Sequence, residues 1–277
     1  MRPLAQFRAQ MRVTRMLITN FEQPVGFDGL QLVKRSIEER TRKILAHTLL
    51  HDLSKPISSE EIDLAEAWAR VQHDRTGSKS LTCTYRMHTL LSEALALIYR
   101  PANAQGHREE VEIYLPGAQL SDAETAEIID GLLPFTCETL QASFAGWTPA
   151  ADDYVIEAKL RRGVDEPWNR VDPEIKRFDY LPHELNDLPR MRFVRFDERP
   201  TLPLRLYWLN YWSAYVAREL TFPDVDRDQQ LIAMARKSSI GAWVVKLTAD
   251  PLDIERSEHV QQLAWAYQRF SSVGARI

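Results

Sequence analysis

The feature that most constrains the fold is an aromatic stretch in the C-terminal third, LYWLNYWSAY at 206–215. Five of its ten residues are Tyr or Trp, whereas aromatic residues make up 9% of the whole chain. On a helix they would form two adjacent stripes, one of Tyr207, Tyr211 and Tyr215 and one of Trp208 and Trp212. We therefore predict a structural helix over 205–220 that packs on a sheet. The alternative is that part of this face is an exposed binding surface, because Trp and Tyr dominate such surfaces.

Other segments alternate between strand-like and helix-like patterns along the chain. Alternation of apolar and polar residues predicts strands at 81–87, 109–117, 152–160, 191–199 and 241–248. Helical periodicity and capping residues predict helices through most of the first fifty residues and at 58–72, 121–144, 227–238 and 255–270. The segment 88–100 fits a helix or a strand, and helix is the preferred interpretation. This mixture predicts an α+β fold, with a mostly antiparallel sheet covered by helices and a helical N-terminal region.

The domain organisation follows from the same patterns. We expect a helical N-terminal region at 1–75 and an α+β domain at 76–277, with one continuous domain as the alternative. Residues 163–190 contain four prolines and many acids, which is typical of a long surface excursion. The basic N-terminus resembles a transit peptide to some extent, but an amphipathic first helix is the preferred interpretation.

Composition points to a protein of the cytoplasm. The sequence has no run of 18 apolar residues, so we expect no membrane-spanning helix. Its two cysteines, Cys83 and Cys137, form no CxxC pair, and no Cys/His cluster has the spacing of a zinc site. The ten glycines contain neither GxGxxG nor GxxxxGK[ST], so we expect no nucleotide or other cofactor.

Charge is divided unevenly along the chain. Residues 1–50 hold nine basic and four acidic side chains and residues 51–277 hold 26 basic and 35 acidic ones, so the net charge of −4 divides into +5 and −9. An acidic body repels nucleic acid and suits a basic protein partner. The candidate partner-binding acids lie in loops and at helix starts: Glu109, Glu110, Asp122, Glu124, Glu127, Asp224, Asp226 and Asp228. Each could equally be a solvated charge or a helix-dipole partner.

One motif allows a catalytic alternative. Glu157-Ala-Lys159 has the E-x-K spacing of restriction-type nucleases, whose carboxylates hold Mg²⁺. On a strand, Asp153, Glu157 and Lys159 would share one face, but the acids lie too close along the chain to reach one metal ion. A solvated strand face is therefore the preferred interpretation. His47 and His51 lack the third ligand and the glutamate of a zinc protease, so we expect no metal site and no catalytic residues.

The C-terminal third resembles the immunity protein 52 family. The matching pieces are Trp208-Leu-Asn210-Tyr211, the stretch from Trp243 to Thr248, Pro251-Leu-Asp253 and Glu258-His259. The resemblance covers roughly 75 residues of the C-terminal third. It implies an α+β fold and a bacterial protein encoded beside a toxin that it binds. It also implies that Asp253 or Ser257 caps the last helix and that Glu258 lies in its first turn.

Three functions follow as hypotheses. The first is a cytoplasmic immunity protein that neutralises a cognate type VI toxin, with a DNase as the expected toxin, by stoichiometric binding. The second is a metal-dependent nuclease that uses Glu157 and Lys159. The third is an adaptor that loads an effector onto a secretion machine without protecting the cell.

Overall fold

The structure is a computed structural model, which describes residues 13–42, 46–51, 65, 68–69, 79–85, 95–100, 109–116, 122–161, 181–192 and 202–276. The chain forms two compact units. One is Arg12–Ala145, here called the N-terminal unit, and the other comprises Gly146–Ile277 with Met1–Met11, here called the C-terminal unit. The predicted boundary at residue 75 lies outside the described residues.

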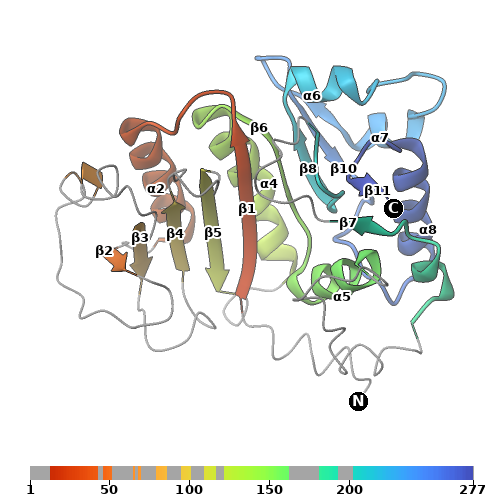
Figure 1. Ribbon diagram of the computed structural model, residues 1–277, viewed down its shortest axis with the longest axis horizontal. Helices are drawn as coiled ribbons and strands as arrows, with labels where there is room; N and C mark the ends of the chain where they lie inside the picture. Colours follow the sequence, from red (N-terminus) through yellow and green to blue (C-terminus); the bar gives the residue numbers. More distant parts are fainter. Residues whose placement is uncertain are drawn as a thin grey trace. The chain divides into compact units, whose positions relative to one another are not determined.

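The N-terminal unit is an antiparallel sheet with two helices on one face (Figure 1). Its strand order is β2-β3-β4-β5-β1-β6. The strands are β1 (Val13–Phe21), β2 (Ala46–His51), β3 (Lys79–Tyr85), β4 (Leu95–Arg100), β5 (Glu110–Pro116) and β6 (Ala142–Trp147), and the helices are α2 (Phe27–Thr41) and α4 (Asp122–Thr139).

Alternation along the central strands builds the core of this unit. Val111, Ile113 and Leu115 of β5 are all buried, and Ile113 lies opposite Met16 of β1 and Leu97 of β4. These side chains share one face because residues two apart on a strand point the same way. The predicted strand at 109–117 and its buried face are therefore confirmed.

Helices α2 and α4 run antiparallel and lie side by side. A Cβ atom at Gly29 would lie 3.1 Å from a Leu140 methyl group, so the start of α2 meets the end of α4. The other end of the contact is Gly131, where a Cβ atom would lie 2.5 Å from the guanidinium of Arg40. The inner faces of both helices are buried through residues such as Ile37 and Leu133.

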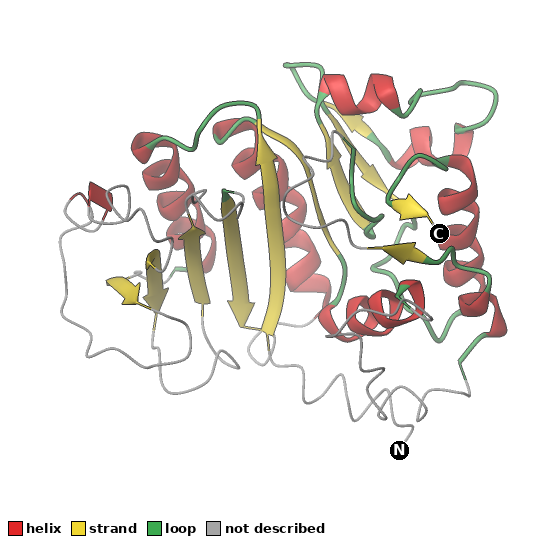
Figure 2. Cartoon of the chain, in the orientation of Figure 1, coloured by secondary structure: helices red, strands yellow, loops and turns green. Residues whose placement is uncertain are grey.

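The C-terminal unit combines short strands with four helices (Figure 2). Its three-stranded antiparallel ladder has the order β8-β10-β9, and β7 pairs with β11. The elements are α5 (Ala150–Leu160), the 3-10 helix η3 (His183–Asn186), β7 (Met191–Arg192), β8 (Leu209–Trp212), α6 (Ala214–Glu219), α7 (Gln229–Met234), β9 (Arg236–Lys237), β10 (Trp243–Lys246), α8 (Ser257–Arg269) and β11 (Ala275–Arg276).

Large aromatic side chains fill the core of the C-terminal unit. Trp147 packs edge-on against Trp208, with ring centroids 5.4 Å apart. Trp212 is surrounded in the same way by Phe222 and Phe270, at 5.3 and 5.1 Å. The indole N–H of Trp208 donates to the carbonyl oxygen of Thr248, 2.9 Å away, so this buried polar atom keeps a partner. The aromatic stretch is thus largely internal.

The predicted helix over 205–220 is wrong in its first half. Leu209–Trp212 form strand β8, which is buried along its whole length and pairs with β10. The helix begins only after Ser213, whose hydroxyl accepts a hydrogen bond from the backbone N–H of Val216. Trp208, Tyr211 and Trp212 are therefore core residues of a strand region, as structural as expected but in another element. Tyr215 lies on α6 and is 41% exposed.

Several other elements differ from the prediction. The segment 152–160 is helix α5 rather than a strand. Strand β4 forms at the end of the segment 88–100, where helix was the preferred prediction. Strands β1 and β2 form within the first fifty residues, where helix was predicted. Three predicted helices are confirmed as α4, α7 and α8. Two predicted strands are confirmed as β3 and β10. The α+β class with a mostly antiparallel sheet is also confirmed. Most of the predicted helix 58–72 lies outside the described residues.

Candidate functional site

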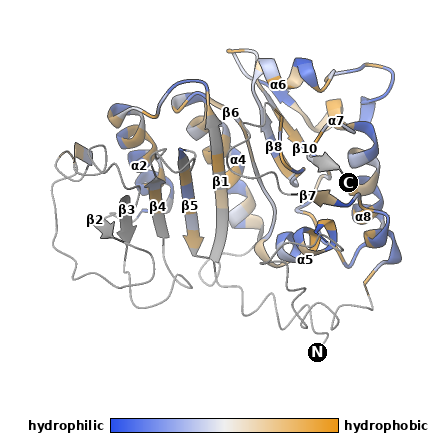
Figure 3. Cartoon of the chain, viewed as in Figure 1, coloured by the Kyte–Doolittle hydropathy of each residue, from blue (hydrophilic) through white to orange (hydrophobic). Residues whose placement is uncertain are grey.

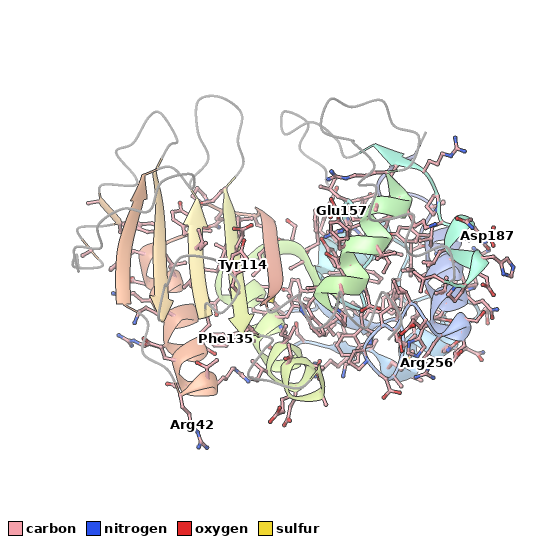
Figure 4. The ribbon with its side chains drawn as sticks, turned by 90° about the horizontal axis from the view of Figure 1, so that it is seen from below. Arg42, Tyr114, Phe135, Glu157, Asp187 and Arg256 are labelled. Atoms are coloured by element: carbon pink, nitrogen blue, oxygen red, sulfur yellow. The ribbon has the colours of Figure 1, made fainter. Side chains whose placement is uncertain are left out.

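The carboxylates of the nuclease-like motif hold an arginine of their own chain. Asp153 and Glu157 lie one turn apart on α5, because the segment is a helix. A terminal nitrogen of Arg205 lies 2.8 Å from Asp153 Oδ2, and the other lies 3.0 Å from Glu157 Oε2. The Arg205 side chain is only 6% exposed. Glu157 is labelled in Figure 4.

The charges around Arg205 are complementary. Burial alone would lower the pKa of Arg205, but the carboxylates of Asp153 and Glu157 raise it well above its ordinary value. The guanidinium also lies 4.7 Å from the centre of the Tyr207 ring. Lys159 donates to Asn186 at 3.3 Å on the surface. The acids of the motif are thus committed to a structural cation, which is a role that the sequence prediction missed.

A second buried ion pair accounts for one of the predicted partner-binding acids. Asp228 is fully buried, and both of its carboxylate oxygens accept hydrogen bonds from Arg269, at 2.7 and 3.0 Å. The same carboxylate accepts from the backbone N–H of Asp224 at 2.9 Å. Asp228 therefore ties the start of α7 to the end of α8 and is not a partner-facing residue.

Its neighbours shape the loop before α7. Asp224 is partly exposed, and its Oδ1 accepts hydrogen bonds from the backbone N–H groups of Asp226 and Arg227 at 3.1 and 3.3 Å. This is the local hydrogen bonding that aspartate uses to form turns. Asp226 is exposed. Of the three predicted acids in this loop, one is buried, one is largely engaged in the turn and one faces solvent.

Glu109 is an internal acceptor in the N-terminal unit. Its Oε1 accepts from the hydroxyl of Tyr99 at 2.7 Å and from the backbone N–H of Val25 at 2.9 Å. Burial raises the pKa of Glu109, and the two hydrogen bonds lower it in part. The carboxylate thereby joins the end of β4 to the segment before α2. The side chains of Glu110 and Asp122 lie outside the described residues.

The remaining two predicted acids, Glu124 and Glu127, are exposed on α4. This helix, Asp122–Thr139, contains five acidic residues and no basic one, whereas α2 beside it has three of each. The two exposed acids lie in the first half of α4, where they also favour the helix dipole. Together with Asp226, they are the described members of the predicted set whose exposure suits contact with another molecule.

Two exposed apolar side chains lie on the same pair of helices. Leu32 of α2 is 47% exposed and Phe135 of α4 is 37% exposed. Phe135 is labelled in Figure 4 on the helical side of the sheet. Sequence reasoning missed both residues. The available signal for Phe135 was the position of a large aromatic residue directly after Pro134, off the buried stripe formed by Leu132, Leu133 and Cys137.

The C-terminal unit also exposes apolar side chains, around the start of α6. Tyr215, Val225 and Ile240 are 41%, 72% and 61% exposed. The turn between β9 and β10 approaches α6, because a Cβ atom at Gly241 would lie 3.5 Å from that of Ala214. Figure 3 shows the tip of this turn as hydrophobic. Arg218 lies over the Tyr215 ring at 5.4 Å.

His259 lies inside the predicted P-L-D…E-H segment and has a structural role. It is 5% exposed, and its Nδ1 accepts a hydrogen bond from the backbone N–H of Asp253 at 3.1 Å. Burial, together with the positive charge of Arg256, lowers the pKa of His259. The ring is therefore held neutral, because only the neutral form offers a lone pair at Nδ1.

The expected cap of the last helix is wrong in detail. Helix α8 begins after Arg256, and no side chain caps it. Ser257 instead donates its hydroxyl to Glu184 at 2.5 Å, and Gln261 donates to the same carboxylate oxygen at 2.9 Å. These two hydrogen bonds lower the pKa of Glu184 to about 2. Glu258 does lie in the first turn, as expected.

Neither a metal site nor a membrane span emerges from the described ranges. Within them, no group of three or more His, Cys, Asp or Glu side chains is arranged to hold a metal ion. No described helix combines the length and apolar character that crossing a bilayer requires. The backbone of His47 and His51 belongs to strand β2, and not to the helix that the spacing suggested.

Comparison with known proteins adds a family model and a fold that is similar to solved structures. Residues 170–277 match a model described as a domain of unknown function, DUF5953. No curated protein matches the chain. Its fold is similar to a structure described as Pseudomonas aeruginosa T6SS protein PA0821, with a TM-score of 0.57 and 15% identity over 93% of this chain and 72% of the other. The resemblance to the immunity protein 52 family stays an interpretation of the sequence.

Proposed function

We propose that this chain is an immunity protein, which neutralises a secreted toxin by binding it in a stoichiometric complex. The observation that carries the proposal is the contrast between committed and exposed side chains. The carboxylates with catalytic spacing, Asp153 and Glu157, hold Arg205 in the interior. Apolar side chains such as Phe135 and Leu32 remain exposed beside the acids of α4. A protein that acts by surface fit needs such side chains and no reacting group.

The setting that we propose is type VI secretion. The similar fold belongs to a protein described as a Pseudomonas aeruginosa T6SS protein. The motifs around Trp208, Trp243 and Glu258 resemble an immunity family whose members are encoded beside toxins. These two lines of support are independent, because one comes from the backbone and the other from the sequence.

The inhibition that we propose requires no turnover and no cofactor. A DNase toxin needs a positively charged surface to bind the phosphates of DNA. An acidic protein that docks on this surface excludes the substrate and associates quickly, because opposite fields steer the encounter. The net charge of −9 over residues 51–277 suits this role. The complex would form in the cytoplasm, where an incoming DNase meets its target.

A co-expression experiment tests the proposal. The toxin encoded by the neighbouring gene is induced in cells that carry either this chain or an empty vector, and survival is counted. Protection, with a 1:1 complex of the two purified proteins, is the expected outcome. A complex without protection would favour an effector-loading adaptor instead. Mg²⁺-dependent DNA cleavage by the purified chain, lost in Glu157→Ala, would establish the nuclease alternative and overturn the proposal.

A further inference from the structure

Two exposed apolar side chains lie on the α2–α4 helix pair, between its two end contacts. The antiparallel contacts place Gly29 of α2 beside the end of α4 and Arg40 beside Gly131. Leu32 lies one turn from the end of the contact that Gly29 marks, and Phe135 lies one turn from the opposite end, which Gly131 marks. Since both helices rise about 1.5 Å per residue, these two positions fall between the same pair of contacts. Both side chains are more than a third exposed.

The acids of α4 continue this surface toward the start of the helix. One face of α4 contains positions 124, 128, 131 and 135, because these are spaced three or four residues apart. Glu127 lies at the edge of this face. Glu124 and Glu127 are exposed, and Ile128, which follows Glu127, is half-buried. From Glu124 to Phe135 the face is about 16 Å long. We call the surface formed by Leu32, Phe135, Glu124 and Glu127 the helix-pair face.

We propose that the helix-pair face docks a basic protein surface that presents an apolar side chain to Leu32 and Phe135. The inference rests on the proposed function and names the surface that binds the toxin. Charge complementarity identifies the occupant. Helix α4 contributes five acidic residues and no basic one, and the charges of α2 cancel. Apolar anchors beside complementary charges are the usual composition of an energetically important interface.

The same charges argue against other occupants. A symmetric dimer through this face would bring the acidic helix α4 of one copy close to that of the other, and like charges repel across an interface. Nucleic acid and anionic lipid surfaces are repelled for the same reason. A basic protein is the partner that these side chains attract.

The test measures the affinity of the full-length chain for the toxin of the neighbouring gene by calorimetry. The double variant Leu32→Ser/Phe135→Ser removes the apolar anchors, and Glu124→Gln/Glu127→Gln removes the charges with little change of shape. The matched control is Val225→Ser/Ile240→Ser, which removes two exposed apolar side chains of the C-terminal unit. Urea unfolding of each variant shows whether it is folded.

We expect the anchor variant to weaken binding by about 30-fold or more, and the control by less than about 3-fold. The charge variant should slow association, and its rate should depend less on salt than that of the wild type. Wild-type binding that neither helix-pair variant weakens would overturn this inference and leave the proposed function standing. Loss of binding in the control alone would also overturn it. A wild-type chain that does not bind the toxin would overturn both.

Discussion

Arg269 and Asp228 form a bidentate ion pair inside the C-terminal unit. Nitrogen–oxygen distances of 2.7 and 3.0 Å join the guanidinium at the end of α8 to the carboxylate before α7. Arg269 also donates to the carbonyl oxygen of Thr221 at 2.9 Å. The Asp228 side chain is fully buried and that of Arg269 is 9% exposed, so water competes little with the pair.

Removal of one partner should therefore cost more stability than removal of both. We expect Arg269→Met to lower the free energy of unfolding by about 3 kcal/mol, because Asp228 would be left as a buried, unpaired charge. The double variant Arg269→Met/Asp228→Leu should recover part of this loss. Urea unfolding of the two variants and of the wild type measures the difference. Equal stability of Arg269→Met and the wild type would contradict the buried pair.

The ion pairs of Arg205 with Asp153 and Glu157 give a prediction that distinguishes a structural role of these carboxylates from a catalytic one. Arg205→Met removes the cation of Asp153 and leaves Glu157 with Arg161 alone, 2.8 Å away. Because the two carboxylates are 24% and 30% exposed, the change should lower the free energy of unfolding by about 1.5 kcal/mol. Glu157→Gln keeps one hydrogen-bond acceptor and should cost about 1 kcal/mol. Thermal unfolding reports both values. A Glu157→Gln protein that is as stable as the wild type would show that the carboxylate is free for another role.

The pH dependence of stability should show the neutral state of His259. Its pKa is lowered in the folded protein, whereas in the unfolded chain a histidine titrates near about 6.5. The folded state thus binds fewer protons, and stability falls as the pH drops below about 6.5. His259→Asn can accept the same hydrogen bond without titrating, so its unfolding midpoint should depend less on pH between about 5 and 7. Parallel midpoint curves for both proteins would contradict this origin.

Gly146 allows a close approach of the Tyr207 ring. A Cβ atom at position 146 would overlap this ring and lie 2.8 Å from the Cβ atom of Tyr207. Gly146→Ala should therefore lower the free energy of unfolding by about 2 kcal/mol, as overpacking does. In the background of Tyr207→Ala the same change should cost less, because the ring is removed and only the contact with the Cβ atom at 2.8 Å remains. A double-mutant cycle by urea unfolding gives the coupling, and additive effects would exclude the steric explanation.

The sequence predicted elements whose periodicity was unambiguous. Helix α8 keeps Val260, Leu263 and Tyr267 on one buried face, which is a helical pattern. Strand β5 alternates through Val111 and Ile113 with equal clarity. In both cases the aliphatic residues of the sequence follow one period, so the period alone identifies the element.

The misassigned elements are those in which the order of apolar and polar residues fits the wrong period or fits two periods equally well. All four residues of β8 are buried, so its Tyr and Trp residues show no alternation, and their spacing also fits a helix. In α5 the alternating pattern of 152–160 suggested a strand. The stronger signals were Pro149 before the segment and Asp152 and Asp153 in its first turn, which are typical of a helix start.

The sequence predicted only part of the helix-pair face, because the rest depends on contacts between segments that lie far apart in the chain. Glu124 and Glu127 could be proposed from their position near a helix start, and their exposure agrees with that proposal. The sequence could not show that Asp228 is buried against Arg269, because this contact joins residues far apart in the chain. Nor could it show that Leu32 and Phe135 share a surface, because this depends on how α2 and α4 pack.

The pairing of β8 with β10 also affects how the protein emerges during synthesis. Trp212 is covered by Phe222 and Phe270, which follow it in the chain, and strand β8 can pair with β10 only when Trp243–Lys246 have been made. Until then a ribosome-bound chain exposes a cluster of large aromatic side chains that invites chaperones or aggregation. Efficient production of this protein should therefore depend on chaperone capacity more than the stability of its finished fold would suggest.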